Sequence, residues 1–245
     1  MTTNQLKKYS KATPKESNKL MVQNFECRFC GNKFHRESTL STHMCVKKRR
    51  HMEIDSPASR SGFRTFQKFY DITMGSKKPK STQEFIESDF YIDFVKFGNH
   101  VVNLKPVYPD KFIEFVIRNG VNLRDWTKDF VYDTYIEDLI KKEPAEAATE
   151  RTIITMAEWA TEHKTNFTDF FKNVSANEAA RLIRTGKISP WVLYLSESGG
   201  SLIDAFNDDH AKIVGSIIDP GYWMKKFKNN DDVSYIKDIL AQSGI

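Results

Sequence analysis

The sequence of 245 residues contains only three cysteines, and all three lie between positions 27 and 45. So few cysteines, gathered in one place, exclude a framework of disulfide bonds and favour a reducing compartment. No apolar run approaches the roughly 18 residues that a membrane helix needs. Residues 1–19 also lack the apolar core of a secretory signal. We therefore expect a protein that is not secreted and has no membrane partner.

The sequence also lacks the common motifs of enzymes. It has no Walker loop, no GxGxxG, no HExxH and no GxSxG. The histidines His100, His163 and His210 have no partners at ligand or catalytic spacing. Adjacent carboxylates such as Asp208 and Asp209 are explained by helix capping and by the helix dipole. We expect no enzymatic activity and no small-molecule substrate.

One stretch does indicate a chemistry, and it runs from Phe25 to His43. Cys27 and Cys30 are separated by two residues and can offer two thiolates to one metal ion, with Gly31 suited to the tight turn that follows. Phe34, Leu40 and His43 then occur at the spacing of a finger in which a hairpin carries the thiolates and a helix carries the imidazole. So short a segment cannot bury enough apolar surface to fold alone. The metal, zinc, must supply most of its folding free energy.

The fourth ligand is open between two residues. The regular finger leaves three to five residues between its last two ligands, and those spacings fall on Lys47, Lys48 and Arg49, none of which binds zinc. Cys45 is close to the metal along the chain, but it reaches the site only if the helix ends or distorts after His43, because residues two apart on a helix point roughly 200° apart. His51 requires the helix to unwind or fold back, since eight residues rise about 12 Å. We favour Cys45 and keep His51 as the alternative.

The charge of the chain is unevenly distributed. Residues 1–60 contain 13 basic and 5 acidic residues, a net charge of +8, which leaves 24 basic and 27 acidic residues, or −3, for the remainder. This distribution is typical of a protein that binds a polyanion, most simply nucleic acid. The four basic residues directly behind the metal site are expected to leave it together and meet phosphates: Lys47, Lys48, Arg49 and Arg50.

Apolar residues recur at helical spacing from residue 61 to the C-terminus, so the fold class is mainly α. We expect a basic, disordered tail (1–23), a ββα zinc finger (24–46), a basic connector (47–60) and an all-α domain (61–245). Ser81 with Glu84 predicts a capping box. Gly98 predicts a helix end. We also expect a helix over 124–142 with Trp126 and Phe130 on its inner face, and a loop over 198–200.

Six aromatic residues of this domain could form a stacking surface for bases, but at helical spacing they are more often part of a core. They are Tyr132, Tyr135, Trp191, Tyr194, Tyr222 and Trp223.

The stretch from Phe25 to His43 resembles the C2H2-type zinc-finger family, without its regular last ligand. In that resemblance four residues take the base-facing positions of the finger helix: Arg36, Ser38, Thr39 and Thr42. Arg36 could pair bidentately with guanine, whereas the other three are short and discriminate weakly between bases. One finger covers about three base pairs, so any sequence specificity would be low.

Three further segments look like parts of uncharacterised zinc-finger proteins from large contractile-tailed bacteriophages of marine bacteria. They are residues 69–73, 94–100 and 186–191. This resemblance implies a setting, the cytoplasm of an infected bacterium, more than an activity. The sequence thus predicts a zinc-binding protein that binds nucleic acid weakly and mostly without specificity, or serves as an adaptor in transcription or replication. The alternative is a structural or regulatory module whose zinc site docks a protein of the transcription or virion machinery.

Overall fold

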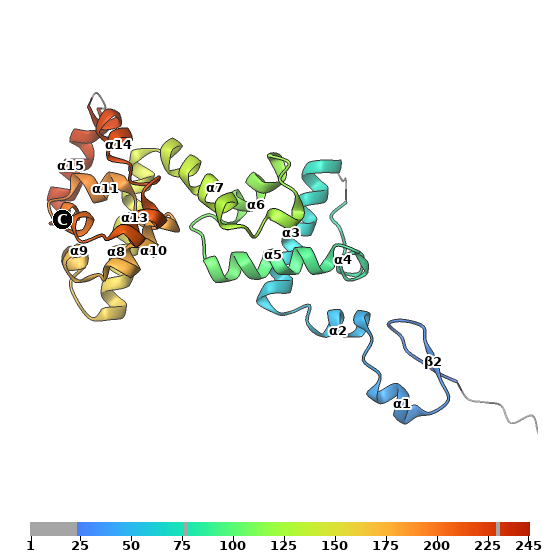
Figure 1. Cartoon of the computed structure of the whole chain (residues 1–245). Helices are drawn as coiled ribbons and strands as arrows, with labels where there is room; N and C mark the ends of the chain where they lie inside the picture. Colours follow the sequence, from blue (N-terminus) through green and yellow to red (C-terminus); the bar gives the residue numbers. More distant parts are fainter. Residues whose placement is uncertain (1–23, 76–77, 229–230) are drawn as a thin grey trace, which may run out of the picture. The chain divides into compact units, whose positions relative to one another are not determined.

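The computed structural model describes residues 24–75, 78–228 and 231–245 (Figure 1). The chain divides into two compact units, of which the first ends at Met52 and the second runs from Glu53 to Ile245. The disordered tail that the sequence predicts over 1–23 lies outside the described residues. Within the described ranges, no helix combines the length and apolar character needed to cross a bilayer.

The first unit is a small hairpin followed by two short helices. Strands β1 (Phe25–Glu26) and β2 (Lys33–Phe34) pair antiparallel, with Phe25 opposite Phe34. Between the strands Gly31 has φ +73°, the left-handed conformation that its sequence position indicates. Helix α1 (Glu37–Thr42) and helix α2 (Val46–Met52) follow. The segment that the sequence assigns to a connector, 47–60, thus contains most of α2.

Every secondary-structure element described in the second unit is a helix, which confirms the mainly α fold class. Its first helices are α3 (Pro57–Met74), α4 (Thr82–Glu87), α5 (Tyr91–Leu104), α6 (Pro109–Arg118), η1 (Leu123–Asp125) and α7 (Asp129–Lys142). The chain continues through α8 (Ala145–His163), η2 (Phe167–Asp169), α9 (Phe170–Asn173), α10 (Ala176–Arg184) and α11 (Pro190–Leu195). It ends with α12 (Gly199–Asp204), α13 (Asp208–Val214), α14 (Pro220–Phe227) and α15 (Asp232–Ser243).

Several helix starts follow from local sequence. Ser81 accepts a hydrogen bond from the Glu84 amide while the Glu84 carboxylate accepts one from the Ser81 amide, so the predicted capping box is present. Ser175 caps α10 in the same position. Ser189 caps α11, and Pro190 occupies the first helical position, where its missing N–H costs nothing.

The predicted helix end at Gly98 is wrong, because α5 continues through it to Leu104. Gly98 is needed for packing instead. A Cβ atom at this position would lie 2.2 Å from the carbonyl oxygen of Ala58, and one at Gly62 would lie 2.8 Å from the carbonyl oxygen of Phe94. Helices α3 and α5 therefore cross at two glycines, and their backbones approach more closely than any side chain would allow.

Two other expectations are corrected. The helix predicted over 124–142 begins only at Asp129, and Phe130 is 60% exposed instead of facing inward. Trp126 precedes that helix in a turn, yet it is buried because its indole N–H donates to the carbonyl of Val121 while its ring packs on Phe97. Of the loop predicted over 198–200, Ser198 precedes α12, whereas Gly199 and Gly200 are the first residues of this helix.

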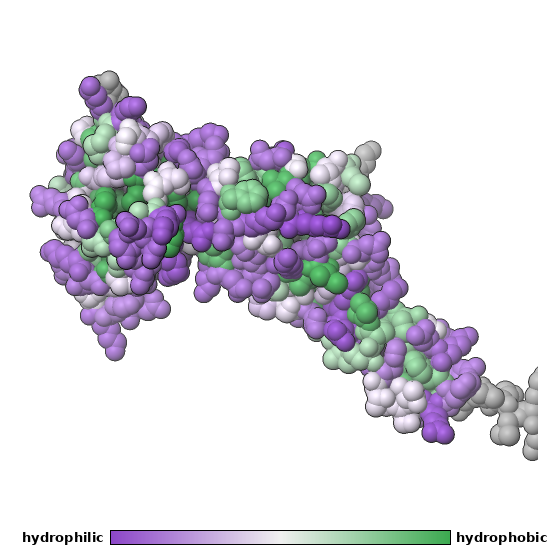
Figure 2. Space-filling view, viewed as in Figure 1, coloured by the Kyte–Doolittle hydropathy of each residue, from purple (hydrophilic) through white to green (hydrophobic). Residues whose placement is uncertain are grey.

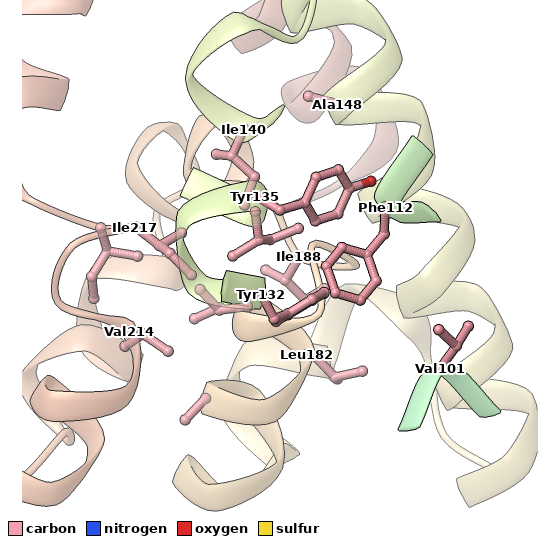
Figure 3. Packing of buried hydrophobic residues seen from close by; sticks show 14 of the residues in the cluster. Val101, Phe112, Tyr132, Tyr135, Ile140, Ala148, Leu182, Ile188, Val214 and Ile217 are labelled. Atoms are coloured by element: carbon pink, nitrogen blue, oxygen red, sulfur yellow. The ribbon is translucent and has the colours of Figure 1, made fainter. Parts of the chain in front are cut away.

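The core of the second unit is rich in aromatic rings. Phe112, Tyr132 and Tyr135 gather in its centre, with ring centroids 5.1 Å apart between Phe112 and each tyrosine (Figure 3). Trp191 packs edge-on against Trp223. Of the six aromatics considered as a base-stacking surface, four are at most 3% exposed, and Tyr194 and Tyr222 are half-buried. These residues belong to the core.

Among the described residues of this unit, one ion pair is buried. The guanidinium of Arg151 binds both carboxylate oxygens of Glu143, and it also donates to the hydroxyl of Tyr108 and to the carbonyl of Gly186. The side chains of Arg151 and Glu143 are 10% and 5% exposed. The surface of this unit, on the face that Figure 2 shows, is mostly hydrophilic.

Candidate metal centre

The hairpin of the first unit places Cys27 and Cys30 on one side of a tight turn. The Cys27 amide donates to the carbonyl of Asn32 at 2.9 Å, and the Gly31 amide donates to the carbonyl of Cys27 at 2.8 Å. These two bonds close the backbone loop between the strands. The left-handed conformation of Gly31 permits the closure, which brings both thiols to the same side.

Helix α1 supplies the imidazole where it ends. Its last residue is Thr42, and His43 has φ −65° and ψ +123°, which is extended backbone. Residues 43–45 are not helical. Because the helix stops here, Cys45 turns back toward the other donors instead of pointing roughly 200° away from His43, as it would on a continued helix.

The four side chains Cys27, Cys30, His43 and Cys45 converge, and their ligand atoms all lie within 4.8 Å of one another. The Cys30 Sγ and His43 Nε2 atoms are 3.3 Å apart. Around a tetrahedral zinc ion with bonds of about 2.0–2.3 Å, donor atoms lie roughly 3.4–3.8 Å apart. The cluster therefore fits such an ion after a contraction of about 1 Å at most. Three thiols and one imidazole are also a donor set that structural zinc takes.

The surroundings of the thiols differ. A hydrogen bond from the backbone N–H of Phe29 lowers the pKa of Cys27, because it stabilises the thiolate. For Cys30 the Asn32 amide also acts to lower the pKa, but burial and the neighbouring thiols of Cys27 and Cys45 outweigh it, so the pKa is raised.

The alternative ligand, His51, is not part of this group. Its ring packs against the ring of Phe29 in the turn between the first two cysteines, with centroids 5.2 Å apart. Arg28 covers Phe29 as well, with its guanidinium carbon 4.7 Å from the ring centre.

Phe34 and Leu40, the expected small core, are both half-buried. The ring of Phe34 lies 4.7 Å from that of His43 and so supports the imidazole. Cys27 is the only fully buried residue among those described in this unit. The metal donors, and not an apolar core, are therefore its centre.

Helix α2 is joined to the cluster through Lys48. The Lys48 backbone N–H donates to Cys45 Sγ at 3.3 Å, and the Lys48 ammonium donates to the carbonyl of His43 at 3.0 Å. The sequence pattern groups Lys48 with the phosphate-binding residues and does not reveal this role. The spacing to Cys45 does carry a signal, because the third residue after a residue that caps a helix carries an N–H without a helical acceptor.

The expected nucleic-acid residues lie on two elements. Arg36 directly precedes α1, and Ser38, Thr39 and Thr42 are within it; all four are exposed. The basic run lies on α2, where successive side chains point about 100° apart. The four basic side chains therefore spread around the helix and do not leave the site together. Lys47 and Arg49 are exposed, whereas Lys48 and Arg50 are half-buried.

Comparison of the chain with protein-family models, with curated proteins and with solved structures gives no match. The structure thus defines a Cys3His cluster beside a hairpin and a helix, in a mainly helical protein, without assigning the chain to a family.

Proposed function

We propose that the first unit is a zinc-binding module of the C2H2-like type that binds nucleic acid through its phosphates. The convergence of Cys27, Cys30, His43 and Cys45 is the observation that carries the proposal, because it supplies four metal-binding side chains within the basic N-terminal part of the chain. The absence of enzymatic activity and the location in the cytoplasm of a phage-infected bacterium stay predictions.

The charge around the cluster favours a polyanion. Residues 24–52 contain seven lysines and arginines against two glutamates, which gives +5. Zinc with three thiolates contributes −1, so the loaded unit keeps a net charge of +4. A positive potential of this kind attracts phosphates over a distance of about one Debye length, close to 8–10 Å in ordinary salt.

The geometry of α2 limits the number of phosphates that are bound at once. The Lys48 ammonium is used within the unit, and the other three basic side chains of α2 do not share one face. Two or three phosphate contacts correspond to a slope of log K against log[salt] of roughly −2 to −3 on duplex DNA. Such binding is weak and mostly independent of sequence. Arg36, exposed at the start of α1, is the residue best suited to a base contact.

The test is a salt titration of fluorescent duplex and single-stranded oligonucleotides by anisotropy, with the protein loaded with zinc. Arg49→Gln should reduce the slope by about 0.9 and weaken all sequences alike. Lys33→Gln is the matched control, because the Lys33 ammonium already faces Glu26 across the hairpin at 4.0 Å. Absence of binding by the folded, loaded protein at about 50 mM salt would contradict the proposal.

A second function is favoured by three exposed apolar side chains. Met44, Val46 and Met52 are 47%, 61% and 64% exposed, and all belong to the first unit. Apolar exposure on so small a unit suits docking to a protein, for example of the transcription or virion machinery. Capture of partners by tagged protein, with and without nuclease, separates the two functions. A partner that survives nuclease treatment and is lost in Val46→Asp would favour docking.

A further inference from the structure

Helix α2 is attached to the metal cluster by three contacts spread along its length. The backbone N–H of Lys48, the third residue of the helix, donates to the Cys45 sulfur, and the Lys48 ammonium donates to the His43 carbonyl. Near the end of the helix, the ring of His51 packs on that of Phe29. We propose that Lys48 is a positioning residue of the metal centre, and that through Lys48 and Cys45 the bound metal determines whether α2 is folded.

Lys48 acts on the loop that carries two of the four donors. His43 and Cys45 are separated by one residue of extended chain, so their relative position depends on the backbone between them. The Lys48 ammonium holds the carbonyl of His43 while its N–H holds the sulfur of Cys45. Its positive charge also offsets the −1 of a zinc ion bound by three thiolates. Partners of this kind, one step removed from a metal, commonly change metal affinity by about ten-fold or more.

Helix α2 is short and buries no side chain. It has seven residues, and isolated helices shorter than about 12 residues are marginal in water. The Cys45 sulfur satisfies the N–H of Lys48, one of the amides that have no acceptor within the helix. When the metal leaves, Cys45 is no longer held at this position, so we expect α2 to unfold.

This coupling makes the basic surface of α2 dependent on metal. Lys47, Arg49 and Arg50 keep fixed directions only while the helix exists. Resting on the proposed function, the inference is that loss of zinc weakens binding to phosphates even though no charged side chain is removed. The metal would thus regulate the affinity for nucleic acid.

The first experiment measures zinc affinity of the full-length protein by competition with a chromogenic chelator. Lys48→Met should weaken zinc binding by roughly ten-fold. Lys48→Arg, which keeps a charged donor, should restore the affinity, and Arg49→Met, which removes the exposed cation one residue later, should leave it unchanged. Equal zinc affinity in Lys48→Met and Arg49→Met would overturn the positioning role. Thermal unfolding of each full-length variant checks that its second unit is folded.

The second experiment measures hydrogen–deuterium exchange of the peptide that covers residues 46–52, in the full chain with zinc or with a chelator. We expect protection with zinc, its loss with the chelator, and partial loss in zinc-loaded Lys48→Met. Protection that persists after zinc is removed would overturn the coupling.

Salt titration then separates this inference from the proposed function. Arg49→Met should reduce the salt slope by about 0.9 without changing zinc affinity, whereas Lys48→Met should lower zinc affinity and, at saturating zinc, change the slope less than Arg49→Met does. If the protein binds no nucleic acid at all, the proposed function fails, but the zinc affinities and the exchange data still decide the role of Lys48.

Discussion

Replacing Gly98 by alanine sets two effects of opposite sign against each other. In the interior of a helix, alanine is favoured over glycine by up to about 1 kcal/mol. At the crossing of α3 and α5, however, the new Cβ would lie 2.2 Å from the Ala58 carbonyl oxygen and 2.5 Å from the Gly62 nitrogen. Both are backbone atoms, which cannot turn aside as the end of a side chain can.

We expect the steric clash to outweigh the gain in helix propensity, so that Gly98→Ala lowers the free energy of unfolding. Restoring a normal carbon–oxygen contact requires the two helices to separate by about 1 Å, which loosens their interface and weakens the packing of rings such as Phe94 on Phe66. Overpacking of a close-packed site costs about 1–3 kcal/mol or more. After the gain in propensity, we expect a net loss of about 2 kcal/mol, which for a unit of this size lowers Tm by roughly 4–8 °C.

The measurement is thermal and urea unfolding of full-length Gly98→Ala against Gly200→Ala. Gly200 also lies in a helix, α12, but a Cβ atom there would meet nothing within 4 Å. The control should therefore be neutral or more stable than the wild type by a fraction of about 1 kcal/mol. If Gly98→Ala is as stable as Gly200→Ala, the close approach of α3 and α5 is wrong.

Three further predictions concern other parts of the chain. One zinc ion should bind per chain, and metal analysis should show its affinity lost in Cys45→Ser and kept in His51→Ala; the reverse result would move the fourth ligand. Glu143→Ala should destabilise the second unit by about 3–5 kcal/mol, measured by urea unfolding, because it leaves a buried guanidinium unpaired. Lys80 and the capping box lower the pKa of Glu84 to about 2, so its contribution to α4 is complete above about pH 4.5 and is lost as the pH falls toward 2. An NMR titration that finds an ordinary glutamate pKa would refute this.

The parts of the fold that the sequence predicts are those set by neighbours along the chain. Ser81 and Glu84 cap a helix start with their own backbone, and Gly31 turns a hairpin through its own φ angle. The convergence of three cysteines and one histidine follows similarly from short spacings. Each of these features is decided within about 20 residues, so no knowledge of distant segments is needed.

The corrected features depend on contacts with other segments. Gly98 resembles a helix end in sequence, and only the presence of α3 against α5 explains why a glycine continues the helix. Trp126 has helical spacing to later aromatics, but its indole bond to Val121 and its contact with Phe97 place it in a turn. By residue type Lys48 belongs with its basic neighbours, whereas its role depends on the position of the His43 carbonyl.

The two units differ in what stabilises them, and this difference should be visible in one experiment. The second unit buries aromatic and aliphatic side chains throughout its core, so its free energy of unfolding should not depend on metal. Among its described residues the first unit buries only Cys27, and the free energy of metal binding must replace the missing apolar burial. A chelator should therefore weaken every property that depends on the folded α1 and α2 while the main melting transition stays in place. Nucleic-acid binding of undiminished affinity in the presence of chelator would not depend on the folding of those two helices.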